Sequence, residues 1–224
     1  MILIVSATQQ EVKELYPNCN LPVGSITRLS VGIRNDINVL ITGVGSVPTT
    51  FHLLTALSKG IYTSVINLGI AGSFTQKLSL GDVVVIEKET FGDYGIDDNG
   101  QLYSLFEKKL ANPNQFPFEN GWIHWTSSKY FPLLSQIPKV RGVTVSTASG
   151  SVEKINKIKK LFSPDIETME GAAVFYTCSM KNVPYICLRG ISNMVEPRNV
   201  SNWNLPLAIN NVCLEAKKLI EKLP

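Results

Sequence analysis

The sequence predicts an α/β sandwich with a mainly parallel sheet. Short, continuous apolar runs rich in branched residues alternate along the chain with segments of helical periodicity. Glycine-rich turns follow several of these runs, as is usual where a strand leads into a helix. The chain has 224 residues, of which 44% are hydrophobic and 17% charged, which is enough for one sizeable core. One domain over residues 1–224 is therefore expected.

The first element is the apolar run Ile2–Val5, which is short, continuous and branched and so predicts a buried strand. A helix is expected at about residues 9–16, because a proline follows and stops it. Residues 26–33 and 38–42 are expected to form two further strands around a turn at 34–36.

The second predicted helix carries Pro48 in its first turn, where the missing N–H is tolerated, and Gly60 caps its end. Residues 65–68 are the next expected strand, and they lead into a glycine-rich turn at 69–73. A further strand is expected at 83–86.

Residues 92–140 are poor in periodicity and rich in Gly, Pro and Asn, so a long irregular excursion is expected there. Loops of that length inside a compact domain are usually functional. Two alternatives stay open at this point: the excursion closes over a ligand, or it packs on another subunit. The contacts of Phe91–Tyr94 at its start are also left open.

Regular elements return after the excursion, with a strand at 143–146 and a helix that begins at the N-cap Ser151 and ends at Phe162. The elements expected after it are a strand at 166–168, a helix at 169–180, a strand at 185–188 and a helix at about 205–223. The helical residues expected to face the core are Val152, Ile155, Ile158, Leu161, Leu205, Ala208, Ile209, Val212, Ala216, Leu219 and Ile220.

The charge distribution argues against a nucleic-acid partner. The formal net charge is +3, but the basic residues are scattered. Their densest run, 154–160, alternates with Ile155 and Ile158 like the solvated face of a helix. No stretch approaches the roughly 20 apolar residues of a membrane span, so no membrane partner is expected. The first residues lack a basic segment, so a cytoplasmic location is expected.

Neither a metal nor a cofactor is expected. The two histidines, His52 and His124, have no partner at ligand spacing, which also leaves little material for a Ser-His-Asp triad. Gly43 and Gly45 are followed by Pro48 where a dinucleotide fingerprint would need glycine, and there is no Walker motif. The cysteines, expected to be reduced core thiols, are Cys19, Cys178, Cys187 and Cys213.

Ligands of α/β sheets sit beyond the carboxyl ends of the strands. The segments expected at those ends are 6–11, 43–46, 69–73, 146–150, 166–170 and 189–193. The motifs in and near these segments are Ala7–Val12, Thr42–Gly45, Asn67–Gly72, Gly81–Val85, Glu167–Ala172 and Arg189–Asn193, together with Phe91–Gly95, Pro197, Arg198 and Trp203. In this order they resemble the purine nucleoside phosphorylase and nucleosidase superfamily, and most closely its futalosine hydrolase branch, which serves menaquinone synthesis and which the last four matches resemble in particular.

The resemblance implies a three-layer α/β/α sandwich with a central mixed, mainly parallel twisted sheet, and it assigns roles to two carboxylates. Glu11 matches the glutamate that activates water, a task that requires a base as water captures an oxocarbenium-like ribosyl cation. Without the resemblance, Glu11 would be an exposed glutamate near a helix start. Met169 and Glu170 match the ribose-binding pair, and the preceding Thr168 is expected in the same substrate-binding segment.

The resemblance implies that nucleosidases acting on adenine nucleosides have an aspartic acid at the position of Asn193, so this residue is a departure from their pattern. An asparagine NH₂ can donate to N7 and O6 of a 6-oxopurine, so a hypoxanthine base is favoured. The base is expected between the backbone of Ala71 and Gly72 and the segment Val145–Thr147. Arg189 and Ser192 are expected to orient the loop, with Glu170 or Glu167 as the partner of Arg189.

Water is favoured over phosphate as the acceptor. Where the phosphorylase pattern has an arginine and a serine to hold phosphate, this chain has Asn67 and Ile70. The expected function is hydrolysis of a purine nucleoside, most closely futalosine to hypoxanthine and dehypoxanthine futalosine, with Arg198 or Arg141 as candidates for the carboxylate of that substrate.

The alternatives are a phosphorylase, a methylthioadenosine or adenosylhomocysteine nucleosidase, and a non-catalytic nucleoside-binding module. The module is disfavoured because Glu11 and Glu170 are both present, and binding alone does not require a carboxylate that activates water. The resemblance also implies a homodimer or a larger homo-oligomer. The partners expected are therefore a small nucleoside, water and further copies of the chain.

Overall fold

The computed structural model describes residues 1–17, 20–32, 34–126 and 128–223. Cys19, one of the predicted core thiols, and Ile33, the last residue of a predicted strand, lie outside the described residues. The remaining thiols, Cys178, Cys187 and Cys213, are buried and free, which confirms the prediction for them.

The strands lie in a mixed sheet and a separate hairpin. They are β1 (Ile2–Ser6), β2 (Ile26–Val31), β3 (Arg34–Ile41), β4 (Ser64–Ser73), β5 (Val83–Phe91), β6 (Gly95–Asp98), β7 (Gln101–Ser104), β8 (Phe118–Glu119), β9 (Trp122–His124), β10 (Lys139–Thr144), β11 (Ile166–Thr168) and β12 (Tyr185–Met194). The α-helices are α1 (Ser46–Lys59), α2 (Val152–Phe162), α3 (Gly171–Met180) and α4 (Leu205–Lys222), and the short 3₁₀ helices are η1 (Gln9–Val12), η2 (Ser128–Leu134) and η3 (Val200–Asn202).

The mixed sheet has the strand order β2-β3-β1-β4-β11-β10-β5-β9-β8. β12 pairs with both β4 and β5, so the sheet closes on itself through β4, β12, β5, β10 and β11. β1 runs parallel to β3 and β4, and β12 runs parallel to β4, whereas β2–β3 and β5–β9 are antiparallel. The predicted α/β fold with a central mixed sheet is confirmed.

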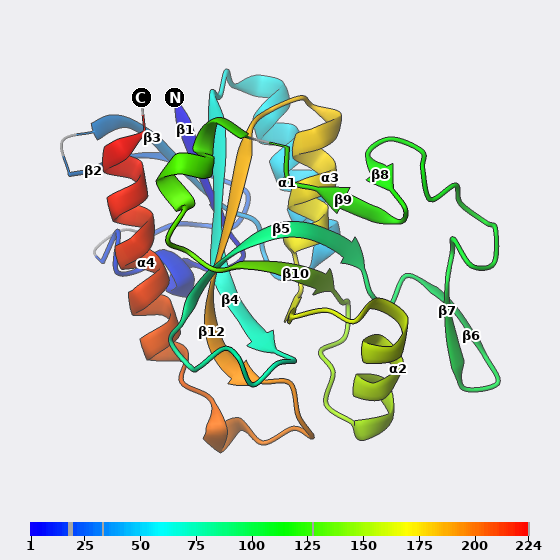
Figure 1. The fold of residues 1–224 in the computed structure, drawn as a ribbon. Helices are drawn as coiled ribbons and strands as arrows, with labels where there is room; N and C mark the ends of the chain where they lie inside the picture. The colour runs from blue at the N-terminus through cyan, green and yellow to red at the C-terminus, as the bar shows by residue number, and fades with distance from the viewer. Residues whose placement is uncertain (18–19, 33, 127, 224) are drawn as a thin grey trace.

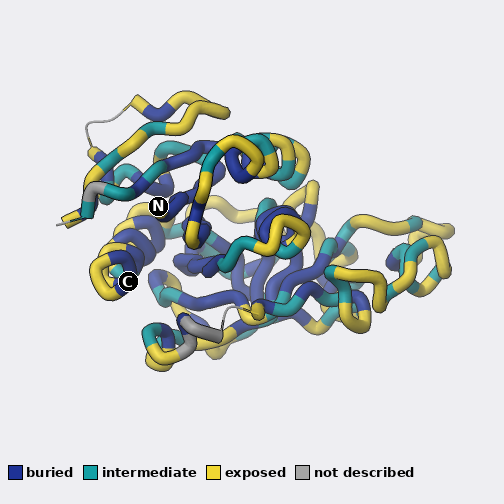
Figure 2. The backbone as a smooth tube through the Cα atoms, turned by 90° about the horizontal axis from the view of Figure 1, so that it is seen from above, coloured by how far each residue is buried: buried dark blue, intermediate teal, exposed yellow. Residues whose placement is uncertain are grey.

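The helices lie on both sides of these strands (Figure 1). α4 packs on β12 and β4, while α1 and α3 pack on each other, with α3 against β10 and β5 (Figure 1). Figure 2 shows the buried residues concentrated in the central strands. Within the part of the chain that the structure describes, no helix combines the length and apolar character needed to cross a bilayer.

The inward faces of the helices follow the predicted spacing except at their first residues. Ile155 and Ile158 of α2 are buried, but Val152, the first residue of the helix, is 60% exposed. Ile158 packs in a small apolar cluster with Val143 and Val145. The predicted core residues of α4 are buried from Ala208 onward, whereas Leu205, in its first turn, is 37% exposed. Leu161 is half-buried.

Several predicted boundaries are wrong, and the largest errors concern the strands at the centre. β4 does not end at residue 68 but runs on through the glycine-rich segment to Ser73, and β12 runs on to Met194. The two strands pair in parallel along this whole length, so tertiary pairing overrides the turn propensity of glycine. Gly69 has a specific reason to lack a side chain, because a Cβ there would lie 2.9 Å from Oε1 of Glu11.

The other differences lie near the N-terminus and in the excursion. The helix predicted at residues 9–16 is only the short η1, and Arg34, predicted in a turn, begins β3. Residues 92–140 are less irregular than predicted, because the antiparallel pairs β6–β7 and β8–β9 form there. The helix 46–59 and its cap Gly60 are confirmed, and so is Ser151 as the N-cap of α2.

Candidate active site

A cavity of about 300 Å³ opens at the carboxyl ends of β1, β4, β11 and β12. Its wall is made of residues 7–8, 10–11, 44, 70–72, 148–150, 167–170, 192–196, 198, 203, 205 and 209. These are segments that lie far apart in the sequence and meet only because the strands that precede them are neighbours. The cavity therefore lies beyond the carboxyl ends of the strands, where ligands of α/β sheets bind.

Most of the predicted site residues line this cavity. They are Glu11, Ala71, Gly72, Thr168, Met169, Glu170, Ser192 and Asn193. Val145, Thr147 and Arg189 are absent from its wall. Val145 is fully buried in the cluster beneath α2, and residues 148–150 form the wall in place of the predicted Val145–Thr147.

Glu11 is held by backbone and hydroxyl donors and is only 8% exposed, unlike a solvated residue at a helix start. Its Oε2 accepts hydrogen bonds from the backbone N–H of Thr8 at 2.9 Å and from the hydroxyls of Ser6 and Thr8 at 3.1 Å. Its Oε1 accepts from the backbone N–H of Ile70 at 3.3 Å. These donors fix the direction of the carboxylate toward β4 and leave it at the cavity wall.

Glu170 is the second carboxylate of the cavity and stands at the N-cap of α3. Its Oε1 accepts a hydrogen bond of 2.8 Å from the backbone N–H of Gly45. Burial raises the pKa of the Glu170 carboxyl, the Gly45 bond opposes this shift, and the charge of Glu11 adds to it. The carboxylates of Glu11 and Glu170 therefore repel each other within one cavity.

Asn193 lies at a bulge of β12, where the register with β4 shifts between Ile191 and Asn193. Its Oδ1 accepts a hydrogen bond of 2.8 Å from the hydroxyl of Ser192, and its Nδ2 donates to the carbonyl of Met194 at 2.9 Å. A Cβ on Gly72 would lie 3.0 Å from this Nδ2. Val195 Cγ2 would lie 2.8 Å from the same Cβ, so Asn193 and Val195 fill the space over Gly72 and a side chain at position 72 would displace them.

Arg189 is buried inside β12 and does not bond to either predicted partner. Its Nη2 donates a hydrogen bond of 2.6 Å to Oδ1 of Asn67, and its Nη1 donates to the carbonyl of Leu188 at 2.9 Å. Arg189 pairs with Gly69 in the register of β4, which brings it beside Asn67. It forms no hydrogen bond with Glu167 or Glu170, but its charge lowers the pKa of the Glu170 carboxyl, which burial raises, so the expected partnership with Glu170 is electrostatic.

Sequence reasoning missed a buried carboxyl group next to the site. Glu89 of β5 is fully buried, and its Oε1 accepts from the hydroxyls of Thr144 at 2.8 Å and Thr168 at 3.1 Å. These hydroxyls in turn accept from the backbone N–H groups of Ala172 and Gly171 at the start of α3. The network therefore supports the helix end that carries Glu170. A glutamate in a strand offers no local sequence signal for such a role.

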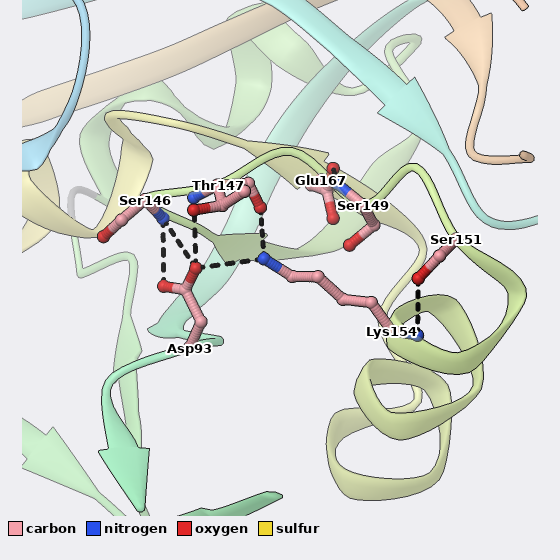
Figure 3. Close-up of polar contacts among 7 residues, drawn as sticks. All are labelled: Asp93, Ser146, Thr147, Ser149, Ser151, Lys154 and Glu167. Atoms are coloured by element: carbon pink, nitrogen blue, oxygen red, sulfur yellow. Dashed lines mark hydrogen bonds and ion pairs between the residues drawn. The ribbon is translucent and has the colours of Figure 1, made fainter. Parts of the chain in front are cut away.

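Two further carboxylates hold the segment 146–150 (Figure 3). Asp93 accepts from the backbone N–H groups of Ser146 and Thr147 at 2.9 and 3.1 Å and pairs with the Lys154 ammonium at 3.2 Å. Glu167 accepts from the backbone N–H of Ser149 at 2.8 Å. One contact of the segment Phe91–Tyr94 is thereby identified, since Asp93 positions the loop that continues into the cavity wall.

The two arginines considered for a substrate carboxylate differ in position. Arg198 lines the cavity, and its guanidinium lies 5.1 Å from the centre of the Trp203 ring. Arg141 forms an ion pair of 3.2 Å with Asp165 and is not part of the cavity wall. Among the residues that the structure describes, no cluster of three or more His, Cys, Asp and Glu side chains is arranged to hold a metal ion.

Comparison with known proteins identifies the family. The sequence profile of the Phosphorylase superfamily matches residues 1–222. A 5'-methylthioadenosine/S-adenosylhomocysteine nucleosidase of Staphylococcus aureus (strain JH9) is 29% identical over 219 residues, which cover 88% of this chain and 87% of that protein.

Solved structures agree in fold. Futalosine hydrolase of Helicobacter pylori strain 26695 superposes with a TM-score of 0.76 at 18% identity, covering 99% of this chain and 97% of that chain. The 5'-methylthioadenosine/S-adenosylhomocysteine nucleosidase of Neisseria meningitidis also gives 0.76 at 18% identity, covering 99% of each chain. These relatives are nucleosidases, which are N-glycosyl hydrolases, and the resemblance noted in the sequence is confirmed at the level of the superfamily. The chain belongs to the Phosphorylase superfamily.

Proposed function

We propose that this protein hydrolyses the N-glycosidic bond of a 6-oxopurine nucleoside, with futalosine as the substrate. The observation that carries the proposal is that Glu11, Glu170 and Asn193, which come from three separate segments, line one cavity. Glycosidic hydrolysis requires a base for water, a group that holds the sugar and a group that stabilises the leaving base. The three side chains supply one group for each of these tasks.

In the proposed reaction, Glu170 accepts hydrogen bonds from the ribose hydroxyls while Met169 packs against the sugar. The bond between the anomeric carbon and the base nitrogen breaks, and its electron pair leaves with the purine. Glu11 takes a proton from water as the water oxygen bonds to the anomeric carbon. The Asn193 amide stabilises the charge that grows on the purine, which is then protonated and released.

Water suits this cavity better than phosphate. Arg198 is the one arginine or lysine among the residues of the cavity wall, and the guanidinium of Arg189 is bonded to Asn67. A phosphate dianion beside Glu11 and Glu170 would meet two carboxylates, and the nearby Arg189 guanidinium is bonded to Asn67 and Leu188 and is not part of the cavity wall. A hydrolytic reaction is therefore favoured over phosphorolysis.

The choice of futalosine rests on two side chains. Asn193 can donate a hydrogen bond to a 6-oxopurine, and Arg198 is the cavity residue that can bind a carboxylate at the far end of the substrate. The comparisons include both a futalosine hydrolase and methylthioadenosine/adenosylhomocysteine nucleosidases. A nucleosidase for methylthioadenosine or adenosylhomocysteine is therefore the second candidate.

A single assay separates these candidates. The purified protein is incubated with futalosine, inosine or 5′-methylthioadenosine, each with and without phosphate, and the free base is measured. Hypoxanthine released from futalosine without phosphate is the expected result. Release that depends on phosphate would indicate a phosphorylase, faster adenine release from methylthioadenosine would indicate the second candidate, and binding without turnover would indicate a nucleoside-binding module.

We also propose that the protein is a homodimer or a larger homo-oligomer. Val47, Phe51 and Leu54 follow one another at helical spacing on α1 and are 81%, 64% and 44% exposed. Val44, which precedes this helix, lines the cavity, so the apolar face is continuous with the site. A second copy of the chain is the occupant proposed for it, because large exposed apolar patches usually mark contacts between proteins.

A further inference from the structure

The hydrogen bonds to the Glu11 carboxylate are divided unequally between its two oxygens. Among the described residues, Oε2 accepts from the backbone N–H of Thr8 at 2.9 Å and from the hydroxyls of Ser6 and Thr8 at 3.1 Å. Oε1 accepts only from the backbone N–H of Ile70, at 3.3 Å. Each carboxylate oxygen offers about two lone-pair sites, so Oε2 is fully engaged while Oε1 can still accept a hydrogen.

Helix capping explains only part of this arrangement. Thr8 is the N-cap of η1, and Glu11 reaches back to its backbone N–H, as in a capping box. Ser6 is the last residue of β1, lies outside this turn and is fully buried, yet its hydroxyl also contacts Oε2. Capping of a short helix does not require a buried hydroxyl from the preceding strand, so the Ser6 contact needs another explanation.

The Ser6 hydroxyl has one hydrogen to donate and two acceptors within reach. These are Oε2 of Glu11 at 3.1 Å and the carbonyl oxygen of Leu68 at 3.0 Å. An ionised carboxylate is the stronger acceptor, so the hydrogen points to Oε2 while Glu11 is charged. When Glu11 holds a proton, the hydrogen can turn to Leu68, and the buried hydroxyl stays satisfied in both charge states. Ser6 therefore suits a carboxylate that gains and loses a proton.

Resting on the proposed hydrolysis, we propose that Ser6 and Thr8 are positioning residues: their hydroxyls hold Oε2 of Glu11 and leave Oε1 as the oxygen that takes the proton from water. The water oxygen bonds to the anomeric carbon while one of its O–H bonds breaks, and the proton passes to Oε1. The electron pair of the glycosidic bond leaves with the purine, which is then protonated. One water molecule is thus divided between the sugar and the base.

The first measurement removes the two hydroxyls, singly and together, by Ser6→Ala and Thr8→Val. In the double variant only the N–H of Thr8 still holds Oε2, so the carboxylate can turn away from the water. With futalosine as substrate, kcat is expected to fall by about 10- to 100-fold, as for the loss of a hydrogen bond to a charged group. KM should change much less, because Glu170 and Asn193 still hold the nucleoside. Thr8→Ser keeps a hydroxyl and is expected to retain turnover.

Thr90→Val is the matched control for these variants. Thr90 is buried in β5, and its hydroxyl donates to the carbonyl of Gly121, but it does not bond to Glu11 and is not part of the cavity wall. It is expected to lower the melting temperature and leave kcat unchanged. If Ser6→Ala and Thr8→Val behave like this control, the two hydroxyls serve stability alone and the proposal is wrong.

Gly69→Ala tests Oε1 from the other side. A Cβ at this position would lie 2.9 Å from Oε1 of Glu11, closer than side-chain carbons come to other heavy atoms, whereas the Arg189 guanidinium would lie at an ordinary 3.6 Å. The end of the Glu11 side chain can shift, so the added methyl is expected to displace Oε1 and leave the strand in place. A displaced base predicts a fall in kcat of roughly 10²-fold with KM little changed.

The outcomes separate this assignment from the proposed function. A protein that hydrolyses a nucleoside but keeps normal kcat in the double variant or in Gly69→Ala would refute the assignment and leave the function standing. A protein that hydrolyses no nucleoside would refute both, since no water would then be activated.

Discussion

The hydroxyl of Ser192 donates a hydrogen bond of 2.8 Å to Oδ1 of Asn193 and so determines which end of the amide faces Gly72. With the oxygen engaged, the NH₂ end lies over the glycine. Base recognition in the proposed site depends on this orientation, because only the NH₂ end can donate to N7 or O6 of a purine.

Asn193→Asp is expected to improve the use of a 6-amino nucleoside relative to its 6-oxo analogue. An aspartic acid can donate toward N7 when protonated and accept from the 6-amino group when ionised. The ratio of kcat/KM for adenosine over inosine should rise by about 10- to 100-fold, the value of one buried hydrogen bond. An unchanged ratio would show that residue 193 does not read position 6 of the base.

Glu11→Gln is expected to lower kcat by roughly 10²- to 10⁴-fold, because the amide cannot take a proton from water. KM should change much less, since Glu170 still holds the ribose. Thermal unfolding is the control: the melting temperature should stay close to that of the unmodified protein, because the glutamine oxygen can keep the bonds from Thr8 and Ser6 and only the 3.3 Å bond from the backbone N–H of Ile70 is lost. Near-normal turnover would remove Glu11 from the mechanism.

Arg198→Ala is expected to raise KM for futalosine by about 10-fold while leaving KM for inosine nearly unchanged, because only futalosine carries the aryl carboxylate. Arg141→Ala serves as the matched control, since Arg141 is paired with Asp165 outside the cavity wall. Steady-state kinetics on both substrates measures the effect. Equal losses with inosine and futalosine would assign Arg198 a general structural role instead.

The raised pKa of the buried Glu89 carboxyl should make the free energy of unfolding depend on pH. Burial raises the pKa of Glu89 from 4.5 to about 7, although Arg189 and the hydroxyls of Thr144 and Thr168 oppose the shift. The folded protein therefore keeps a proton that the unfolded chain releases above pH 4.5. The free energy of unfolding should fall as pH rises through 4.5 to 7, by on the order of 3 kcal/mol once Glu89 ionises in the fold.

Glu89→Gln should remove this contribution, because the amide does not titrate. Urea unfolding of both proteins between pH 5 and 8 measures it: the difference in unfolding free energy between variant and unmodified protein should shift in favour of the variant as pH rises. A difference that stays constant over this range would mean that Glu89 is already ionised throughout.

Phe51→Asp is expected to shift the protein toward monomers, because a carboxylate on the exposed face of α1 opposes apolar contact between copies. Light scattering after size-exclusion chromatography gives the mass directly. Leu110→Asp, at another exposed apolar side chain distant from α1 in sequence, is the comparison. An unmodified protein that elutes as a monomer at micromolar concentration would contradict the homo-oligomer.

Local patterns in the sequence were sufficient to predict part of this structure. Branched apolar runs located the starts of the central strands, and the cap residues Ser151 and Gly60 located helix ends, because periodicity and capping depend on near neighbours in the chain. The ordered motifs also identified the superfamily. The domain boundary over residues 1–224 stays a prediction.

Only the tertiary structure decided which distant groups meet. The pairing of β12 with β4 extends both strands, turns Arg189 toward Asn67, and sets Glu167 and Asn193 on either side of Gly72. The register that sets Gly72 opposite Glu167 and Asn193 joins residues 95 and 121 positions apart, so composition and spacing do not report it. The sequence by itself determined the fold class and most residues of the cavity; the register of three strands decided which side chains face one another inside it.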